Sequence, residues 1–313
     1  MFGNRTGWAI SAVLLALTAL LLWQIRASAT RISPPGPVGQ AAGRYSLRLP
    51  HDPRGPATWM TEEGDAMELY ARAVGVYLTD ERAFGPSLPR LTLESAQHRT
   101  LQPAMDLLIQ ASRRKAPGVF ADRPQVLVNY RSHRQALAQL EAVARAAFHL
   151  ARLYHMAGEL ERALELYRAR YTLGLKLCEE RLVYAQWNLG RQLLADAGYL
   201  AELEPDRAEA FRRVDAQFAG FYREQVRPVY EAIFVVSPHT GDMAALAQNA
   251  SEITWRIEAV LALGRCRYSA ATAGDQNGAS MLIERLLTDA DARIRLAARA
   301  AHELSEPEFR RLP

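Results

Sequence analysis

The chain has 313 residues, of which 49% are hydrophobic and 23% are charged, and its formal net charge is +4. A chain of this balance buries a core, so the composition excludes wholesale disorder, and the small positive charge does not suggest a protein that coats nucleic acid. Two cysteines are too few for a disulfide framework or for a zinc site made of thiolates. At this length we expect more than one compact domain.

An uncharged apolar stretch over residues 8–25 follows a short N-terminal tail of residues 1–7. A helix of this length spans about 27 Å, close to the thickness of the hydrocarbon core of a bilayer. Trp8 and Trp23 lie near its two ends, where indole rings favour the membrane interface. We therefore predict a single-pass membrane anchor. The alternative is a signal peptide cleaved at Ala27-Ser28-Ala29, which would leave a secreted body.

A tract rich in proline and glycine, residues 26–60, follows the apolar stretch and is predicted to be an extended spacer. Basic residues are nearly balanced across the stretch, with Arg5 before it and Arg26 and Arg31 after it, so charge determines the orientation only weakly. Because long domains cross membranes largely regardless of charge, we predict an extracytoplasmic, periplasmic body at the cell membrane. A body that faces the cytoplasm stays open as an alternative.

Helical periodicity dominates the body of the chain. Residues 61–131 are predicted to be an irregular N-terminal helical region, because prolines interrupt it. Apolar residues recur there at helical spacing from Met67 to Tyr77, and further elements are expected as a helix over 101–114 and a short strand over 126–130. After residue 131 the pattern predicts helices over 132–156, 159–177, 179–197, from 206 to a break or kink at Pro228, then 242–264, 279–287 and 291–304, with a loop at 274–278.

Residues 144–177 resemble a tetratricopeptide repeat, a 34-residue helix-turn-helix unit. The positions that match the pattern of this family are Leu150, Ala151, Tyr154, Gly158, Ala163 and Tyr167. The chain departs from the pattern at Ala147, Arg170 and Leu175, and a second copy that begins near Val183 is weaker.

The C-terminal residues resemble a different family, the HEAT repeat. The run from Trp255 to Gly264 is similar to the second helix of that unit, and Ile294, Arg295, Ala298 and Ala301 continue the same phase 39 residues later. The two resemblances together predict an all-α fold of stacked antiparallel helix pairs, TPR-like over 132–240 and HEAT-like over 241–313. An ordinary helical bundle is the alternative architecture.

No linear motif for catalysis or cofactor binding is found. The seven histidines show no metal-ligand spacing, and the glycines of residues 274–278 lack the lysine and the preceding strand of a phosphate loop. We therefore expect no cofactor, no metal and no nucleic acid, and we predict a scaffold or adaptor rather than an enzyme. The alternative is an all-α extracytoplasmic enzyme that acts on cell-envelope polymers, which two close carboxylates in a deep pocket would favour.

The tetratricopeptide resemblance implies a groove lined by the first helix of the unit. The residues that would face it are Arg145, Phe148, Arg152, His155 and Met156, whose spacing places them along one helical stripe. Two arginines favour an acidic segment or a C-terminal carboxylate, and Phe148 and Met156 would supply apolar contact. The alternative is that the two apolar residues belong to the core and the arginines are a solvated rim.

Overall fold

The structure, a computed structural model, describes residues 18, 31–48, 54–84, 91–116, 118–120, 130–235, 238–270 and 272–303. Apart from Thr18, the predicted anchor over residues 8–25 lies outside this part of the chain, as does the proposed cleavage site. Within the described ranges, no helix combines the length and the apolar character that crossing a membrane requires. Most of the predicted strand over 126–130 also lies outside them.

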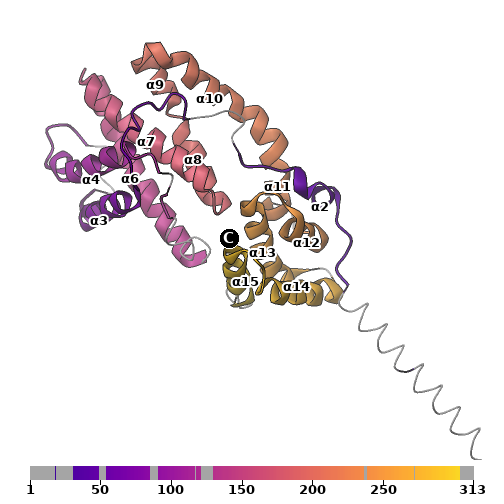
Figure 1. The fold of residues 1–313 in the computed structure, drawn as a ribbon. Helices are drawn as coiled ribbons and strands as arrows, with labels where there is room; N and C mark the ends of the chain where they lie inside the picture. Colours follow the sequence, from indigo (N-terminus) through magenta and orange to yellow (C-terminus); the bar gives the residue numbers. More distant parts are fainter. Residues whose placement is uncertain are drawn as a thin grey trace, which may run out of the picture. The chain divides into compact units, whose positions relative to one another are not determined.

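The prediction of an all-α fold is confirmed, because helices are the regular elements of the described residues and a lone β-bridge joins Glu62 to Arg114 (Figure 1). The helices of the first two thirds are α2 (Pro37–Gln40), α3 (Met67–Phe84), α4 (Ala96–Ser112), α6 (Tyr130–Met156), α7 (Leu160–Glu180), α8 (Tyr184–Leu194), α9 (Ala197–Leu203) and α10 (Ala208–Phe221). The remainder are α11 (Arg227–Tyr230), α12 (Thr240–Asn249), α13 (Ile253–Ser269), α14 (Ala273–Leu286) and α15 (Ala292–Glu303).

The chain divides into two compact units. Unit 1 is drawn from residues 1–43, 230–250 and 258–313, and unit 2 from residues 44–229 and 251–257. Each unit therefore combines segments that are far apart in the sequence. This division differs from the predicted boundaries, which treat the chain as successive blocks.

Unit 2 is built around α7, which packs against α4, α6 and α8 (Figure 1). Its residues 171–178 are all buried, so this helix is covered on every side rather than along one stripe. The turn before α7 uses Gly158, whose φ of 79° lies in the left-handed region that glycine adopts without strain. A tight turn therefore joins α6 to α7, and the two helices pack against each other.

Two glycines allow α7 and α8 to approach closely. A Cβ added to Gly190 would lie 2.7 Å from the carbonyl oxygen of Gly174, and one added to Gly174 would lie 2.8 Å from the carbonyl oxygen of Gly190. Both obstacles are backbone atoms, which cannot rotate away as a side chain does. The pair of helices therefore depends on the absence of side chains at these two positions.

Prolines interrupt the helices less than the sequence predicts. Pro103 lies inside α4, which begins at Ala96 rather than near residue 101, because the buried apolar side chains of this helix pack well enough to offset the lost hydrogen bond. At Pro228, where the sequence predicts a break or a kink, the helical turns continue, so there is no break, and the kink stays a prediction. Wider π-helical turns over Tyr222–Val226 and Glu231–Val235 flank it and accommodate the proline ring.

The predicted loop over residues 274–278 is wrong, because α14 begins at Ala273. Its N-cap, Thr272, accepts a hydrogen bond from the backbone N–H of Asp275 (3.1 Å), and the Thr272 hydroxyl donates to the Asp275 carboxylate (2.8 Å). The first bond satisfies one orphan backbone donor of the first turn, the second fixes the position of the cap, and together they stabilise a helix that contains two glycines. The helix predicted over 242–264 is likewise two helices, α12 and α13.

Unit 1 contains part of the tract that is predicted to be an extended spacer. Residues 33–43 include the short helix α2, which packs against α12, and Gly39, Ala41 and Ala42 are buried. The part of α13 that belongs to this unit, from residue 258 onward, approaches α15 closely, since a Cβ added to Gly264 would be 3.1 Å from the Cα atom of Ala301. These are the two helices that carry the 39-residue match.

Candidate functional site

The five residues of the predicted binding stripe lie on α6, in unit 2. Arg145 and Arg152 are exposed, Phe148 and His155 are half-buried, and the side chain of Met156 is 70% exposed. The sequence analysis offers two roles for Phe148 and Met156, either both in the groove or both in the core. The structure separates them, because Phe148 is half-buried whereas Met156 is exposed at the end of α6.

Phe148 belongs to an aromatic cluster that three helices build. Tyr167 of α7 and Tyr199 of α9 stack face to face, with ring centroids 4.8 Å apart and planes within 1° of parallel. The Phe148 ring meets Tyr199 edge-on at 5.6 Å and Tyr167 edge-on at 6.3 Å. The ring of His155 also approaches Tyr167 edge-on, at 6.5 Å. The structure therefore brings Phe148 and His155 together through Tyr167, a residue of the repeat motif.

The Tyr167 hydroxyl is buried, and none of the described groups forms a hydrogen bond with it. Burial raises the pKa of this hydroxyl to about 12, so it stays a neutral donor at every physiological pH. A buried hydroxyl without a partner costs on the order of 1–3 kcal/mol, so the packing of the Tyr167 ring against its aromatic neighbours must offset this cost.

The surroundings of the cluster are electropositive. Burial lowers the pKa of His149, and the charges of Arg152, Arg145 and Arg170 lower it further. Arg145 forms an exposed ion pair with Glu141 (2.7 Å), of a kind that contributes little to stability. Within the described part of the chain, Arg152 has no carboxylate at ion-pair distance. A neutral histidine beside two exposed arginines is an environment suited to an anion.

Arg170, which departs from the tetratricopeptide pattern, packs against the aromatic cluster. Its guanidinium lies over the Phe148 ring, 4.7 Å from the ring centroid, and forms a bidentate ion pair with Asp196. It also donates to the carbonyl oxygen of Ala144. Both charged side chains are less than a tenth exposed. Arg170 therefore links α6, α7 and the start of α9, and fixes the position of Phe148.

A second group of polar side chains lies at the C-terminal end of α7. These side chains form hydrogen bonds with the non-helical backbone near residues 116 and 120. Lys176 donates to the carbonyl oxygen of Ala116, and the Glu180 carboxylate accepts a hydrogen bond from the backbone N–H of Phe120 (2.9 Å). Burial lowers the pKa of Lys176 to about 8 and raises that of Glu180 to about 7. These bonds give both residues a structural role, which explains the polar positions on this buried helix.

The raised pKa of Glu180 predicts a pH dependence of stability. Between pH 4.5, the ordinary pKa, and about 7, the folded chain holds a proton that the unfolded chain releases, so the free energy of unfolding falls as the pH rises through this window. The Glu180→Gln variant should lose this slope and gain up to about 3 kcal/mol at pH 8. Denaturant titrations at pH 5 and pH 8 measure it. Glu161→Gln, at the exposed start of α7, is the control, and an unchanged slope in Glu180→Gln would refute the assignment.

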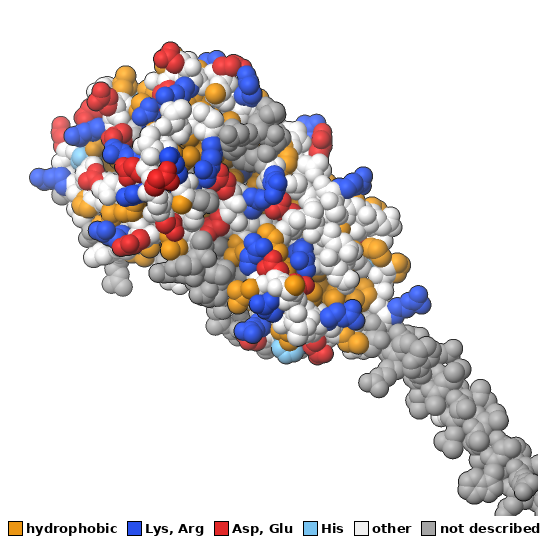
Figure 2. All heavy atoms as spheres, in the orientation of Figure 1, with side chains coloured by type: hydrophobic (Ala, Val, Ile, Leu, Met, Phe, Trp, Pro, Cys, Tyr) orange, Lys and Arg blue, Asp and Glu red, His pale blue; other side chains and the backbone are white. Residues whose placement is uncertain are grey.

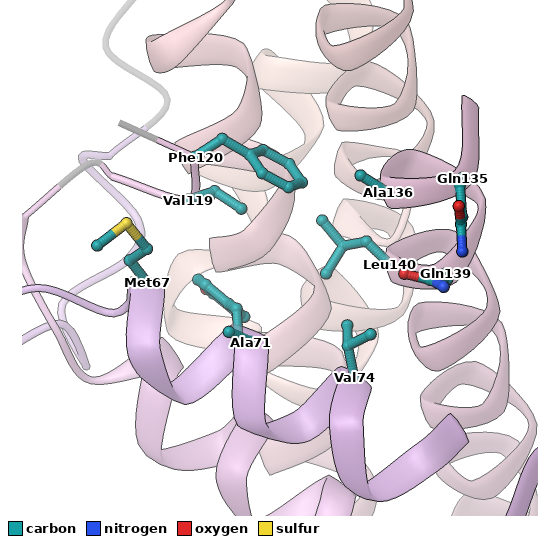
Figure 3. A pocket seen from close by; sticks show the side chains of 10 residues that line it. Met67, Ala71, Val74, Val119, Phe120, Gln135, Ala136, Gln139 and Leu140 are labelled. Carbon is teal, nitrogen blue, oxygen red and sulfur yellow. The ribbon is translucent and has the colours of Figure 1, made fainter. Parts of the chain in front are cut away.

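A cavity of about 300 Å³ lies between α3, α6 and residues 119–120 (Figure 3). Phe120, Val74 and Leu140 point into it, while Gln135 and Gln139 follow one side along α6. None of its lining residues is acidic. In the described ranges, moreover, no three histidine, cysteine or carboxylate side chains are placed to hold a metal ion. The cavity therefore lacks the carboxylate pair that would favour the enzyme hypothesis.

Sequence analysis alone missed Tyr199, Arg170 and Asp196 as parts of this site. Tyr199 lies beyond residues 144–177, which carry the stronger repeat match, and it is not among the positions that match the pattern. Arg170 carries the available signal, because an arginine next to the mostly apolar residues 171–178 favours an anionic partner nearby when its side chain is buried. Comparison of the chain with protein-family models, with curated proteins and with solved structures finds no match.

Proposed function

We propose that the chain is a membrane-tethered helical-repeat scaffold, whose stacked antiparallel helix pairs bind a partner protein at the cell envelope. In this proposal the TPR-like pair α6–α7 presents the binding face, and the HEAT-like helices of unit 1 form a second set of stacked pairs. The apolar stretch over residues 8–25 would anchor the chain in the membrane, with the body on the extracytoplasmic side. No catalysis, cofactor or nucleic acid is part of the proposal.

The carrying observation is the combination of the aromatic cluster with the two exposed arginines of α6. Arg145 and Arg152 lie two helical turns apart, and the half-buried Phe148 ring lies between them in sequence. An acidic segment or a C-terminal carboxylate would pair with the guanidinium groups, and apolar side chains of the same peptide would contact the aromatic rings.

The charge distribution favours a peptide over a polyanion. On the face drawn in Figure 2, acidic and basic side chains of the described residues are interspersed rather than gathered by sign. A nucleic-acid surface needs a continuous basic stripe, whereas a short acidic peptide needs only a local pair of cations. The alternative function, an enzyme acting on envelope polymers, would be favoured by a pocket with two close carboxylates, whereas the described residues that line the cavity beside α3 and α6 are apolar or glutamine.

The Arg145→Glu/Arg152→Glu variant tests the proposed face. Reversal of both charges should reduce recovery of the partner from solubilised membranes by about tenfold or more, because two charge-assisted contacts become repulsive. The matched control is Arg212→Glu/Arg213→Glu, which reverses two exposed arginines of α10. Quantitative mass spectrometry of the material that binds to each variant measures the effect. Equal recovery by the wild type and the α6 variant would end the proposal for this face.

The membrane tether has an independent test. We expect the full chain to stay in the membrane fraction after alkaline extraction and to be digested by protease added to intact spheroplasts. Release of the chain by alkaline extraction would support a cleaved signal peptide instead. Protection of the body from protease would place it on the cytoplasmic side.

A further inference from the structure

Within unit 1, residues 33–43 contact α12 and α14 in the way that a bound peptide contacts a protein. The Asp275 carboxylate of α14 accepts hydrogen bonds from the backbone N–H of Ser33 (2.8 Å) and from its hydroxyl (2.9 Å). The Asp242 carboxylate of α12 accepts one from the backbone N–H of Gly39 (2.7 Å). Both aspartates are buried, at 6% and 8% exposure. Two desolvated carboxylates thus bind the segment mainly through its backbone.

Shape restricts which segment can occupy this site. A Cβ added to Gly39 would lie 2.6 Å from an oxygen of Asp242 and 2.9 Å from its Cα atom, and one added to Gly36 would lie 3.1 Å from the same carboxylate. On the opposite side, Gly241 leaves room for the carbonyl oxygens of Ser33 and Pro34. The site therefore accepts glycine at two positions of the segment and admits its backbone close to α12.

The segment has the composition of a recognition motif with little conformational entropy. Prolines at 34, 35 and 37 restrict the free chain, so less entropy is lost when it binds. Residues 31–36 form no helix, and Gly36, with φ −76° and ψ −169°, is extended before α2 begins at Pro37. Figure 1 shows α2 alongside α12.

We propose that α12 and α14 of unit 1 form a binding site for a peptide rich in proline and glycine, extended over its first residues and helical at Pro37–Gln40, and that residues 33–43 occupy this site as its internal ligand. The ligand class is a segment of the form Ser-Pro-Pro-Gly-Pro-x-Gly, as in residues 33–39. The site selects glycine at two positions because a side chain there would collide with Asp242, and its two carboxylates accept hydrogen bonds from backbone N–H groups of the segment. It is separate from the α6 face of unit 2 and does not depend on the proposed function.

The experiment removes the internal segment from the site by a substitution in the segment itself, and then adds the segment back as a separate peptide. In the full chain, Gly39→Val should expel the segment, because the added side chain would collide with Asp242, and it leaves the amino-acid sequence of α12 and α14 unchanged. A fluorescent synthetic peptide of residues 31–44 should then bind this variant at least about tenfold more tightly than it binds the wild type, whose site is filled. Gly43→Val is the matched control, because a Cβ there makes only an ordinary contact at 3.7 Å, and it should behave as the wild type does.

Two further measurements identify the site. Addition of Asp242→Ala to the Gly39→Val chain should weaken peptide binding by about tenfold or more, because the contact to a charged acceptor is lost. A peptide that itself carries Gly39→Val should not bind. If the Gly39→Val chain loses helix content, the wild-type peptide should restore it. Failure of the peptide both to bind and to restore helix content, or equal binding to wild type and variant, overturns the proposal.

Discussion

The Asp196→Ala variant should lose about 3–5 kcal/mol of stability, one of the two largest effects that the structure predicts. Removal of this carboxylate leaves the buried guanidinium of Arg170 with the Ala144 carbonyl but without a compensating charge. Denaturant-induced unfolding of the full chain measures the loss. Tryptophan fluorescence is a suitable probe, because Trp59, Trp187 and Trp255 all belong to unit 2.

Two controls separate the charge effect from the loss of side-chain volume. Asp206→Ala removes an exposed aspartate and should change stability by less than about 0.5 kcal/mol. Replacement of both partners by apolar residues, as Arg170→Met with Asp196→Leu, should cost far less than Asp196→Ala alone, because no charge is then left buried. If Asp196→Ala cost no more than Asp206→Ala, the ion pair would not support the aromatic cluster.

The second large effect is expected at the contact of α7 with α8. Gly190→Val should destabilise unit 2 by about 3 kcal/mol or more, because its side chain would collide with the backbone of Gly174 and with Cys178 of the facing helix. The helices would have to separate, and the buried residues along α7 would lose contacts. The same unfolding measurement applies, and a cooperative transition at lower denaturant concentration is the predicted result.

Gly75→Val is the matched control for this prediction. Gly75 also lies inside a helix, α3, but nothing lies within 4 Å of the Cβ that would be added. Because valine has a higher helix propensity than glycine, this variant should be as stable as the wild type or slightly more so. Equal destabilisation by the two substitutions would show that the close approach of α7 and α8 does not matter.

Helical periodicity was enough to predict the fold class and most helices of the body. Apolar spacing places α3, α6, α7 and α15 to within a few residues, because each must bury one face against a neighbour. The sequence also predicts that a helix ends at Gly158. In the structure this glycine has a positive φ, a conformation that favours glycine and ends the helix there.

The errors have local causes. The start of α14 was missed because two glycines suggested a loop, although Thr272 and Asp275 have the spacing of a capping box. Pro103 suggests a helix boundary near residue 101, but tertiary packing accommodates this proline inside α4. At Pro228, π-helical turns flank the proline and the helical turns continue past it.

Sequence patterns do not reveal contacts between residues that are far apart in the chain. The tract of residues 33–43 has the composition of a spacer, and only the distant carboxylates of Asp242 and Asp275 make it part of unit 1. Likewise, the stripe on α6 follows from helical spacing, but its aromatic partner Tyr199 comes from a separate helix. Both cases depend on residues that the fold brings together from separate parts of the chain.

The central claim, that the α6 face binds a partner protein, is tested most directly by site-specific photo-crosslinking in native membranes. Benzoylphenylalanine replaces Met156 beside the proposed face or, as the control, Met281 of α14; these side chains are 70% and 54% exposed. We predict a discrete crosslinked product from position 156 that is absent from position 281 and disappears in the Arg145→Glu/Arg152→Glu background. The same products from both positions, or a product that persists after charge reversal, would contradict the claim.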